Sequence, residues 1–205
     1  DNNNCLITNT VTVNVGVLPA PVQANTGPYC VGATIFLSVG AGFVDWDWTG
    51  PLGYNQPNTQ NPSILLSTVT MSGLYTVTVT NAGGCTGTGT TNVVVNPLPV
   101  ANATNTGPYC AGATIQLNSV GGSATDDWTG PLGYNQLNTQ NPTIPGSTVA
   151  MSGVYTVTVT GVGGCTATST TTVTVNPAPV ANATNTGPYC AGATIQLNSV
   201  GGSAT

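Results

Sequence analysis

The sequence predicts an all-β protein made of tandem β-sandwich repeats, and three observations support this fold class. Residues 181–205 repeat residues 101–125 letter for letter, and 21–100 align with 101–180 without a gap, with roughly two thirds of the positions unchanged. Self-similarity at such a fixed period indicates an array of one structural unit. Apolar residues alternate with threonine over 75–80, which is the period of a half-buried strand. Glycine, proline and asparagine separate the short apolar segments, and no helical period is present.

The first full repeat contains about seven expected strands. In chain order they lie at 18–24, 33–39, 43–48, 52–56, 63–70, 74–80 and 86–95, and they correspond to strands A, B, C, C′, E, F and G of a sandwich. Asn81-Ala82-Gly83-Gly84 forms the F–G turn, because its glycines can adopt positive φ angles. About seven strands in one repeat of this length indicate a small β-sandwich.

Four residues of the repeat sharpen this prediction to an immunoglobulin-like sandwich. Trp48 follows Leu37 at the spacing that separates the C-strand tryptophan from the B-strand core position. Tyr75 precedes Val77 by two positions, as in a tyrosine corner. The second repeat has the same set, Leu117, Trp128, Tyr155 and Val157. General core packing by aromatic residues is the alternative, but the recurring spacing favours the sandwich.

Two proline-rich connectors divide the chain. They are Asn96-Pro97-Leu98-Pro99 and Asn176-Pro177-Ala178-Pro179, and two prolines in such a short segment make a semi-rigid linker. We therefore expect a rod with the last strand of a preceding repeat at 1–16, full repeats at 17–97 and 98–177, and the first strands of a following repeat at 178–205. On this interpretation the chain is a segment of a longer array.

The charge composition excludes several function classes. The chain has no Lys, Arg or His, and five aspartates give it a net charge of −5. Without basic residues it cannot neutralise nucleic-acid phosphates or bind an anionic membrane surface. No His, Lys or Glu is present for acid–base catalysis, so we predict neither an enzyme nor a cofactor. No apolar run approaches the length that a membrane-spanning helix needs, so we expect no direct membrane insertion.

Six cysteines recur with the 80-residue period, at positions 5, 85 and 165 and at positions 30, 110 and 190. With no histidine to share a metal, they indicate disulfides and an oxidising compartment, with cytosolic free thiols as the alternative. Pairs within a repeat would be Cys30–Cys85 and Cys110–Cys165. Strands B and F run in the same direction, however, so Cys30 and Cys85 should lie at opposite poles, over about 20 Å apart. A disulfide needs Cα atoms within about 7 Å, which favours an inter-repeat Cys30–Cys165 bond.

Two further features are candidate ligand sites. Asp47 and Asp127, beside Asp45 and Asp126, are weak candidates for Ca²⁺ coordination; a solvated strand edge is the favoured alternative. Trp46 could form an exposed platform for a sugar, but the second repeat lacks it, and a chance surface tryptophan is the simpler interpretation.

The order of motifs resembles a known family. Cys-x-Gly-x-x-Ile-x-Leu at 30–37, Trp-Thr-Gly-Pro-Leu-Gly-Tyr at 48–54, Ser-Gly-x-Tyr-Thr-Val-Thr-Val-Thr at 72–80 and Gly-Gly-Cys-Thr at 83–86 occur in this order in both repeats. They resemble the Ig-like and PKD-like repeats of large secreted adhesins and filaments of Bacteroidota-type bacteria. The resemblance implies an extracellular or cell-surface location and a stalk or filament role, and it implies no ligand.

The sequence therefore predicts a structural repeat segment of an extracellular filament or giant adhesin stalk, giving reach and mechanical strength. The expected partners are neighbouring repeats of the same chain and like filaments. The alternative is a glycan- or surface-binding module that uses its repeats for avidity.

Overall fold

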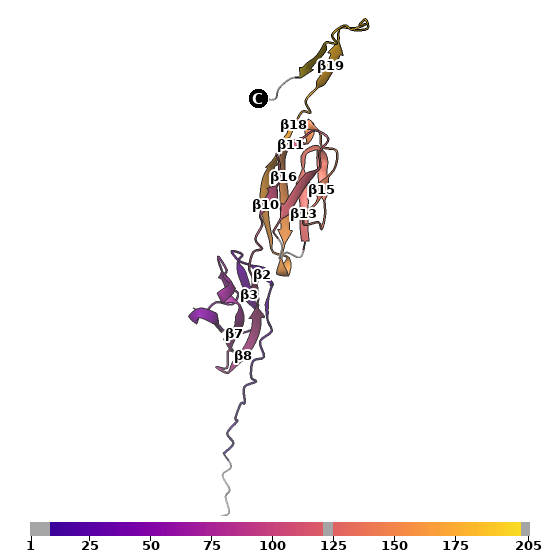
Figure 1. Ribbon diagram of the computed structural model, residues 1–205. Coiled ribbons are helices and arrows are strands. Elements are labelled where there is room, and N and C mark those ends of the chain that lie inside the picture. The colour runs from indigo at the N-terminus through magenta and orange to yellow at the C-terminus, as the bar shows by residue number, and fades with distance from the viewer. Residues whose placement is uncertain (1–8, 121–124, 202–205) are drawn as a thin grey trace, which may run out of the picture. The chain divides into compact units, whose positions relative to one another are not determined.

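The computed structural model describes residues 9–120 and 125–201, and the chain divides into two compact units, residues 1–97 and 98–205. Figure 1 traces the strands of each unit. Both units are all-β, with only short 3₁₀ turns between strands, and both have the strand order of an immunoglobulin-like sandwich.

The first unit pairs its strands in two facing sheets. One sheet has the order β1 (Gln23–Asn25), β3 (Ile35–Val39) and β6 (Ser63–Ile64), which are strands A, B and E. The other has the order β5 (Asn55–Gln56), β4 (Asp45–Thr49), β7 (Gly73–Thr80) and β8 (Thr86–Val93), which are strands C′, C, F and G. A short strand, β2 (Tyr29–Cys30), pairs in parallel with β9 (Val95–Asn96). The 3₁₀ turns are η1 (Pro51–Gly53) and η2 (Val69–Met71).

The second unit repeats this arrangement. Its A-B-E sheet contains β10 (Ala103–Asn105), β12 (Ile115–Ser119) and β15 (Thr143–Ile144). Its C′-C-F-G sheet contains β14 (Tyr134–Gln136), β13 (Thr125–Gly130), β16 (Gly153–Thr160) and β17 (Thr166–Val173). The parallel pair is β11 (Tyr109–Cys110) with β18 (Val175–Asn176), and the 3₁₀ turns are η3 (Pro131–Gly133), η4 (Val149–Met151) and η5 (Val162–Gly164).

The residues expected in the core are buried between the two sheets of each unit. Leu37, Trp48, Tyr75 and Val77 are at most 1 % exposed. The same holds for their counterparts Leu117, Trp128, Tyr155 and Val157. Trp48 Nε1 donates to the Gln60 carbonyl oxygen at 3.2 Å, so its only polar atom is satisfied. The Tyr75 hydroxyl donates to the Met71 carbonyl oxygen at 3.1 Å, which is the hydrogen bond of a tyrosine corner.

Strands A, C′ and E are the most shortened relative to expectation. Strand A was expected at 18–24 but begins at Gln23, because Pro19 and Pro21 have no N–H to donate to a ladder. Strand C′ is reduced because η1 occupies 51–53, and strand E ends at Ile64. Residues 9–22 form no strand, so the described part of the segment 1–16 is not a strand here; residues 1–8 lie outside the described residues.

The parallel pair of β2 and β9 was not predicted from the sequence. Tyr29 and Cys30 align with Val95 and Asn96, and this pairing extends strand G beyond the sandwich edge. Such a short strand cannot show an alternation of apolar and polar residues, so the sequence pattern does not predict it.

Strand A and strand G differ between the units in a compensating way. Gly89 leaves room for the long side chain of Gln23, whose Nε2 donates to the Thr90 carbonyl oxygen. In the second unit the corresponding residues are Ser169 and Ala103, and the Ala103 N–H donates to Ser169 Oγ at 3.0 Å. Strand G therefore contacts strand A in both units, although the two residues at this contact differ between the units.

The last described segment forms a hairpin, β19 (Ala181–Asn185) with β20 (Leu197–Gly201). Its register matches that of the second unit, since Asn185 aligns with Leu197 as Asn105 does with Leu117. Leu197 is 80 % exposed, whereas Leu117 is buried. The identical sequence therefore forms the same A–B hairpin with its apolar face uncovered, and its assignment as the start of a following repeat stays a prediction.

Candidate functional sites: cysteines and a recurring apolar pocket

The cysteines fall into two states. Cys30 and Cys165 are disulfide-bonded, whereas Cys85, Cys110 and Cys190 are free thiols. Since Cys85 and Cys110 are free, neither within-repeat pair, Cys30–Cys85 or Cys110–Cys165, is formed. Cys5 lies outside the described residues.

The position of each cysteine within its unit explains why the within-repeat pairs do not form. Cys30 pairs with Asn96 at the end of strand G, while Cys85 immediately precedes the start of that strand, in the F–G turn. The whole of strand G thus lies between them, and at about 3.3 Å per residue it places the two cysteines roughly 30 Å apart. That far exceeds the Cα separation of about 7 Å that a disulfide can span.

Asp47 and Asp127 anchor turns. Asp47 Oδ1 accepts a hydrogen bond from the Asn58 N–H at 3.3 Å, and Asp127 Oδ1 accepts one from the Asn138 N–H at 2.9 Å. Both asparagines have positive φ angles, 52° and 51°, which asparagine tolerates better than most residues, and each carboxylate fixes its turn by this hydrogen bond. Within residues 9–120 and 125–201 no group of three or more His, Cys, Asp or Glu side chains could hold a metal ion.

Trp46 is partly buried and Asp126 is buried, contrary to two expectations from the sequence. Trp46 is partly buried and packs against the core of the first unit, and its Nε1 is buried without a partner. It is therefore not an exposed sugar platform. Asp126, expected on a solvated strand edge, is only 5 % exposed. The reason is strand alternation: residues 46 and 126 lie two positions before the core tryptophans, so they share the inward face.

A small apolar pocket recurs in both units, at the turn between strands C and C′. Its volume is about 210 Å³ in the first unit and about 180 Å³ in the second. The seven lining residues are identical in type: Pro51, Leu52, Gly53, Tyr54, Ile64, Met71 and Tyr75, and in the second unit Pro131, Leu132, Gly133, Tyr134, Ile144, Met151 and Tyr155. From the sequence, the Trp-Thr-Gly-Pro-Leu-Gly-Tyr motif indicates only a family resemblance. Its intact recurrence was the available signal for this pocket.

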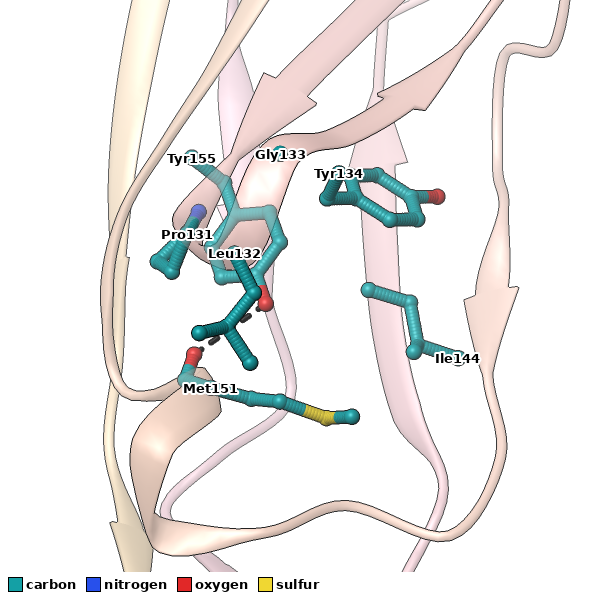
Figure 2. Close-up of a pocket in the computed structure, with 7 residues that line it drawn as sticks. All are labelled: Pro131, Leu132, Gly133, Tyr134, Ile144, Met151 and Tyr155. Atoms are coloured by element: carbon teal, nitrogen blue, oxygen red, sulfur yellow. Dashed lines mark hydrogen bonds between the residues drawn. The ribbon is translucent and has the colours of Figure 1, made fainter.

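The turn that carries the pocket holds a leucine on the surface. Leu132 has φ of 57° and is 71 % exposed, and Leu52 has φ of 58° and is 72 % exposed. A left-handed backbone is uncommon for leucine, so the turn keeps an apolar side chain at the pocket rim at a cost in backbone strain. In Figure 2 Leu132 and Met151 lie on one side of the pocket, Ile144 lies opposite them, and the ring of Tyr134 lies above Ile144.

The two tyrosines of each pocket offer a ligand no hydroxyl that is both accessible and unpaired. The Tyr155 hydroxyl donates to the Met151 carbonyl oxygen at 3.1 Å, drawn as a dashed line in Figure 2. The Tyr134 hydroxyl is buried without a partner, and Figure 2 shows it directed away from Tyr155. The two rings meet edge to face, with centroids 5.6 Å apart. The pocket therefore presents ring carbons and aliphatic groups.

Burial raises the pKa of all four pocket tyrosines, and for Tyr54 and Tyr134 the neighbouring tyrosine raises the pKa further. Below about pH 10, the ordinary tyrosine pKa, the phenols are neutral in both the folded and the unfolded state. Above it the unfolded chain ionises first, so the stability that these groups contribute is lost as the pH rises. We expect the urea midpoint to be constant from neutral pH to about pH 9 and to fall above about pH 10.

The matched control for this alkaline loss is the double variant Tyr54→Phe/Tyr134→Phe, which removes two of the four phenols and their unpartnered hydroxyls. Its midpoint should fall less steeply above about pH 10. A variant profile as steep as that of the natural chain would show that other groups cause the loss.

The strand order, the buried tryptophan and the tyrosine corner define each unit as an immunoglobulin-like β-sandwich. No family model matches the chain, and no curated protein matches it. No helix in the described residues is long and apolar enough to cross a membrane.

Several solved structures resemble the chain. Murine CEACAM1b is 12 % identical with a TM-score of 0.46, and the match covers 78 % of this chain and 100 % of that one. The immunoglobulin domains 1–5 of Sidekick-1 are 14 % identical with a TM-score of 0.46, over 91 % of this chain and 46 % of that one. The N-terminal domains of the bacteriophage RB49 outer capsid protein Hoc are 16 % identical with a TM-score of 0.36, over 90 % and 69 %. At these scores the similarities carry no conclusion about function, and the fold assignment rests on the strand pairing and core of this chain.

Proposed function

We propose that the chain is a structural repeat segment of an extracellular filament or a giant cell-surface adhesin stalk, which gives reach and mechanical strength. The observation that carries the proposal is the repetition of one sandwich with its pairing registers intact. Two units of similar sequence and the same strand order, each followed by a proline-rich connector, suit a structural spacer better than a catalytic site. The absence of Lys, Arg and His supports the same interpretation, because it removes histidine, the residue used most often in general acid–base catalysis, together with lysine.

We further propose that Cys30 and Cys165 form one inter-repeat disulfide. Both are disulfide-bonded, and the other described cysteines are free. Cys30 lies at the pole where strand G ends and the connector begins, and Cys165 lies in an F–G turn, at the opposite pole of its own unit. In the head-to-tail array that we propose, these two poles would face the same junction. A covalent bond there would resist bending and extension of the junction, and it requires an oxidising, extracellular compartment.

Disulfide mapping tests this pairing. Non-reduced protein is digested with thermolysin or pepsin, since trypsin has no site in a chain without Lys and Arg, and the linked peptides are identified by mass spectrometry. We expect one peptide that joins Cys30 to Cys165. Peptides that join Cys30 to Cys85 would instead indicate independent units and would remove the mechanical argument.

Force spectroscopy tests the consequence. With the bond intact, the chain between Cys30 and Cys165 is shielded from extension, which removes roughly 450 Å of contour length. The Cys30→Ser variant should release this length, whereas the control variant Cys110→Ser, at the equivalent position of the next repeat, should not. Equal contour lengths for the natural chain and Cys30→Ser would contradict the proposal.

A further inference from the structure

We infer that the recurring pocket binds the proline-rich connector of a second copy of this chain, so that filaments associate side by side. The inference rests on the proposed filament function and names the surface through which like filaments would meet. It starts from the pocket lined by Leu52, Tyr54, Ile64, Met71 and Tyr75 and from its counterpart in the second unit.

The size and lining of the pocket determine the class of ligand. Volumes of about 180–210 Å³ are below the roughly 300–1,000 Å³ typical of small-molecule sites, so each pocket holds one or two side chains. One tyrosine hydroxyl of each pair is bonded to a main-chain carbonyl, and the other is buried. A sugar would leave its hydroxyl groups unpaired there, which is costly. The ligand is therefore an uncharged apolar group.

The chain itself supplies a segment of the required chemistry. Extended proline-rich peptides dock into aromatic-lined grooves, because a polyproline segment loses little entropy on binding. The connectors Pro97-Leu98-Pro99-Val100 and Pro177-Ala178-Pro179-Val180 belong to no strand. Leu98 is 49 % exposed, and Val100 and Val180 are 76 % and 77 % exposed.

Pockets and connectors also match in number and period. Each full repeat carries one such pocket and is followed by one connector, so two copies can engage at each repeat, and weak single contacts add up by avidity. No charged side chain lines the pocket or lies in the connectors. The association should therefore be insensitive to salt.

The test titrates the ¹⁵N-labelled full chain with a synthetic peptide of residues 95–101, Val-Asn-Pro-Leu-Pro-Val-Ala, and follows amide shifts by NMR. We expect saturable shifts at Leu52, Gly53, Leu132 and Gly133, unchanged by added salt. The control peptide, in which both prolines are replaced by alanine, should cause none. Absence of saturable shifts at millimolar peptide, or equal shifts with the control peptide, would overturn the inference.

Two variants locate the binding site. Met71→Phe/Met151→Phe fills the pocket and leaves the main-chain carbonyls that accept the tyrosine hydroxyls. Leu52→Asn/Leu132→Asn removes the apolar rim, and asparagine tolerates the left-handed backbone, so this variant keeps its fold even if the first does not. Each should weaken peptide binding about tenfold, since part of a leucine-sized contact is lost. Unchanged binding in the folded variants would place the peptide elsewhere.

Sedimentation of the full chain at rising concentration tests whether a second copy of the chain is the binding partner. Self-association that the peptide inhibits supports a second copy as the occupant. Peptide binding without self-association would contradict the proposal that a second copy of the chain occupies the pocket. This outcome is independent of the disulfide map, so the lateral contact and the stapled-repeat proposal can fail separately.

Discussion

Replacing Trp48 by alanine is expected to lower the free energy of unfolding of the first unit by about 3–5 kcal/mol. Trp48 is fully buried between the two sheets, and its indole donates to the Gln60 carbonyl oxygen at 3.2 Å. The substitution removes the largest side chain of the core, leaves a cavity and deprives a carbonyl of its donor. Urea denaturation, with hydrogen exchange of the β7 amides to identify the first unit, measures the loss.

Trp46 provides the matched control on the same strand, two positions before Trp48. Its Nε1 is buried without a partner, so Trp46→Phe removes an unsatisfied donor and keeps most of the apolar contact. We expect a change near zero or a small gain in stability. If Trp46→Phe destabilised the unit as much as Trp48→Ala, the indole of Trp46 would have a role that the structure does not account for.

Replacing Gly50 by alanine is expected to destabilise the first unit by about 2–3 kcal/mol. The backbone of Gly50 is extended, with φ of −169°, and would accept any residue. A Cβ there, however, would lie 2.5 Å from Tyr75 Cδ1 and 2.6 Å from Cε1. The ring cannot move aside easily, because its hydroxyl is bonded to Met71 and its edge contacts Tyr54.

Gly40→Ala is the control for this substitution. The nearest atom to a Cβ at Gly40 is the Val22 carbonyl oxygen at 3.9 Å, so this variant should unfold at nearly the same urea concentration as the natural chain. Thermal and urea unfolding of the two alanine variants compare them directly. Equal stability of Gly50→Ala and Gly40→Ala would show that the tyrosine corner tolerates a shift of its ring.

Some features of the site could be predicted from the sequence and others could not. The inward position of Trp46 was predictable, because Trp46 and Trp48 are alternate residues of one strand and must share a face. The shallow pocket was not, because it depends on where Ile64 and Met71 lie relative to a turn at Pro51–Gly53. The burial of Asp126 follows from the same strand alternation, since Asp126 lies two positions before Trp128.

Local patterns in the chain were sufficient to predict the repeating unit, its strand order and its core. The 80-residue period, the threonine alternation and the spacing of Leu37, Trp48 and Tyr75 are present whatever the surroundings of each segment. Three-dimensional packing was needed to establish how β2 pairs with β9 and that a pocket opens beside Leu52. These features arise where segments far apart in the chain meet, and their geometry is set by packing between sheets, which no local pattern encodes.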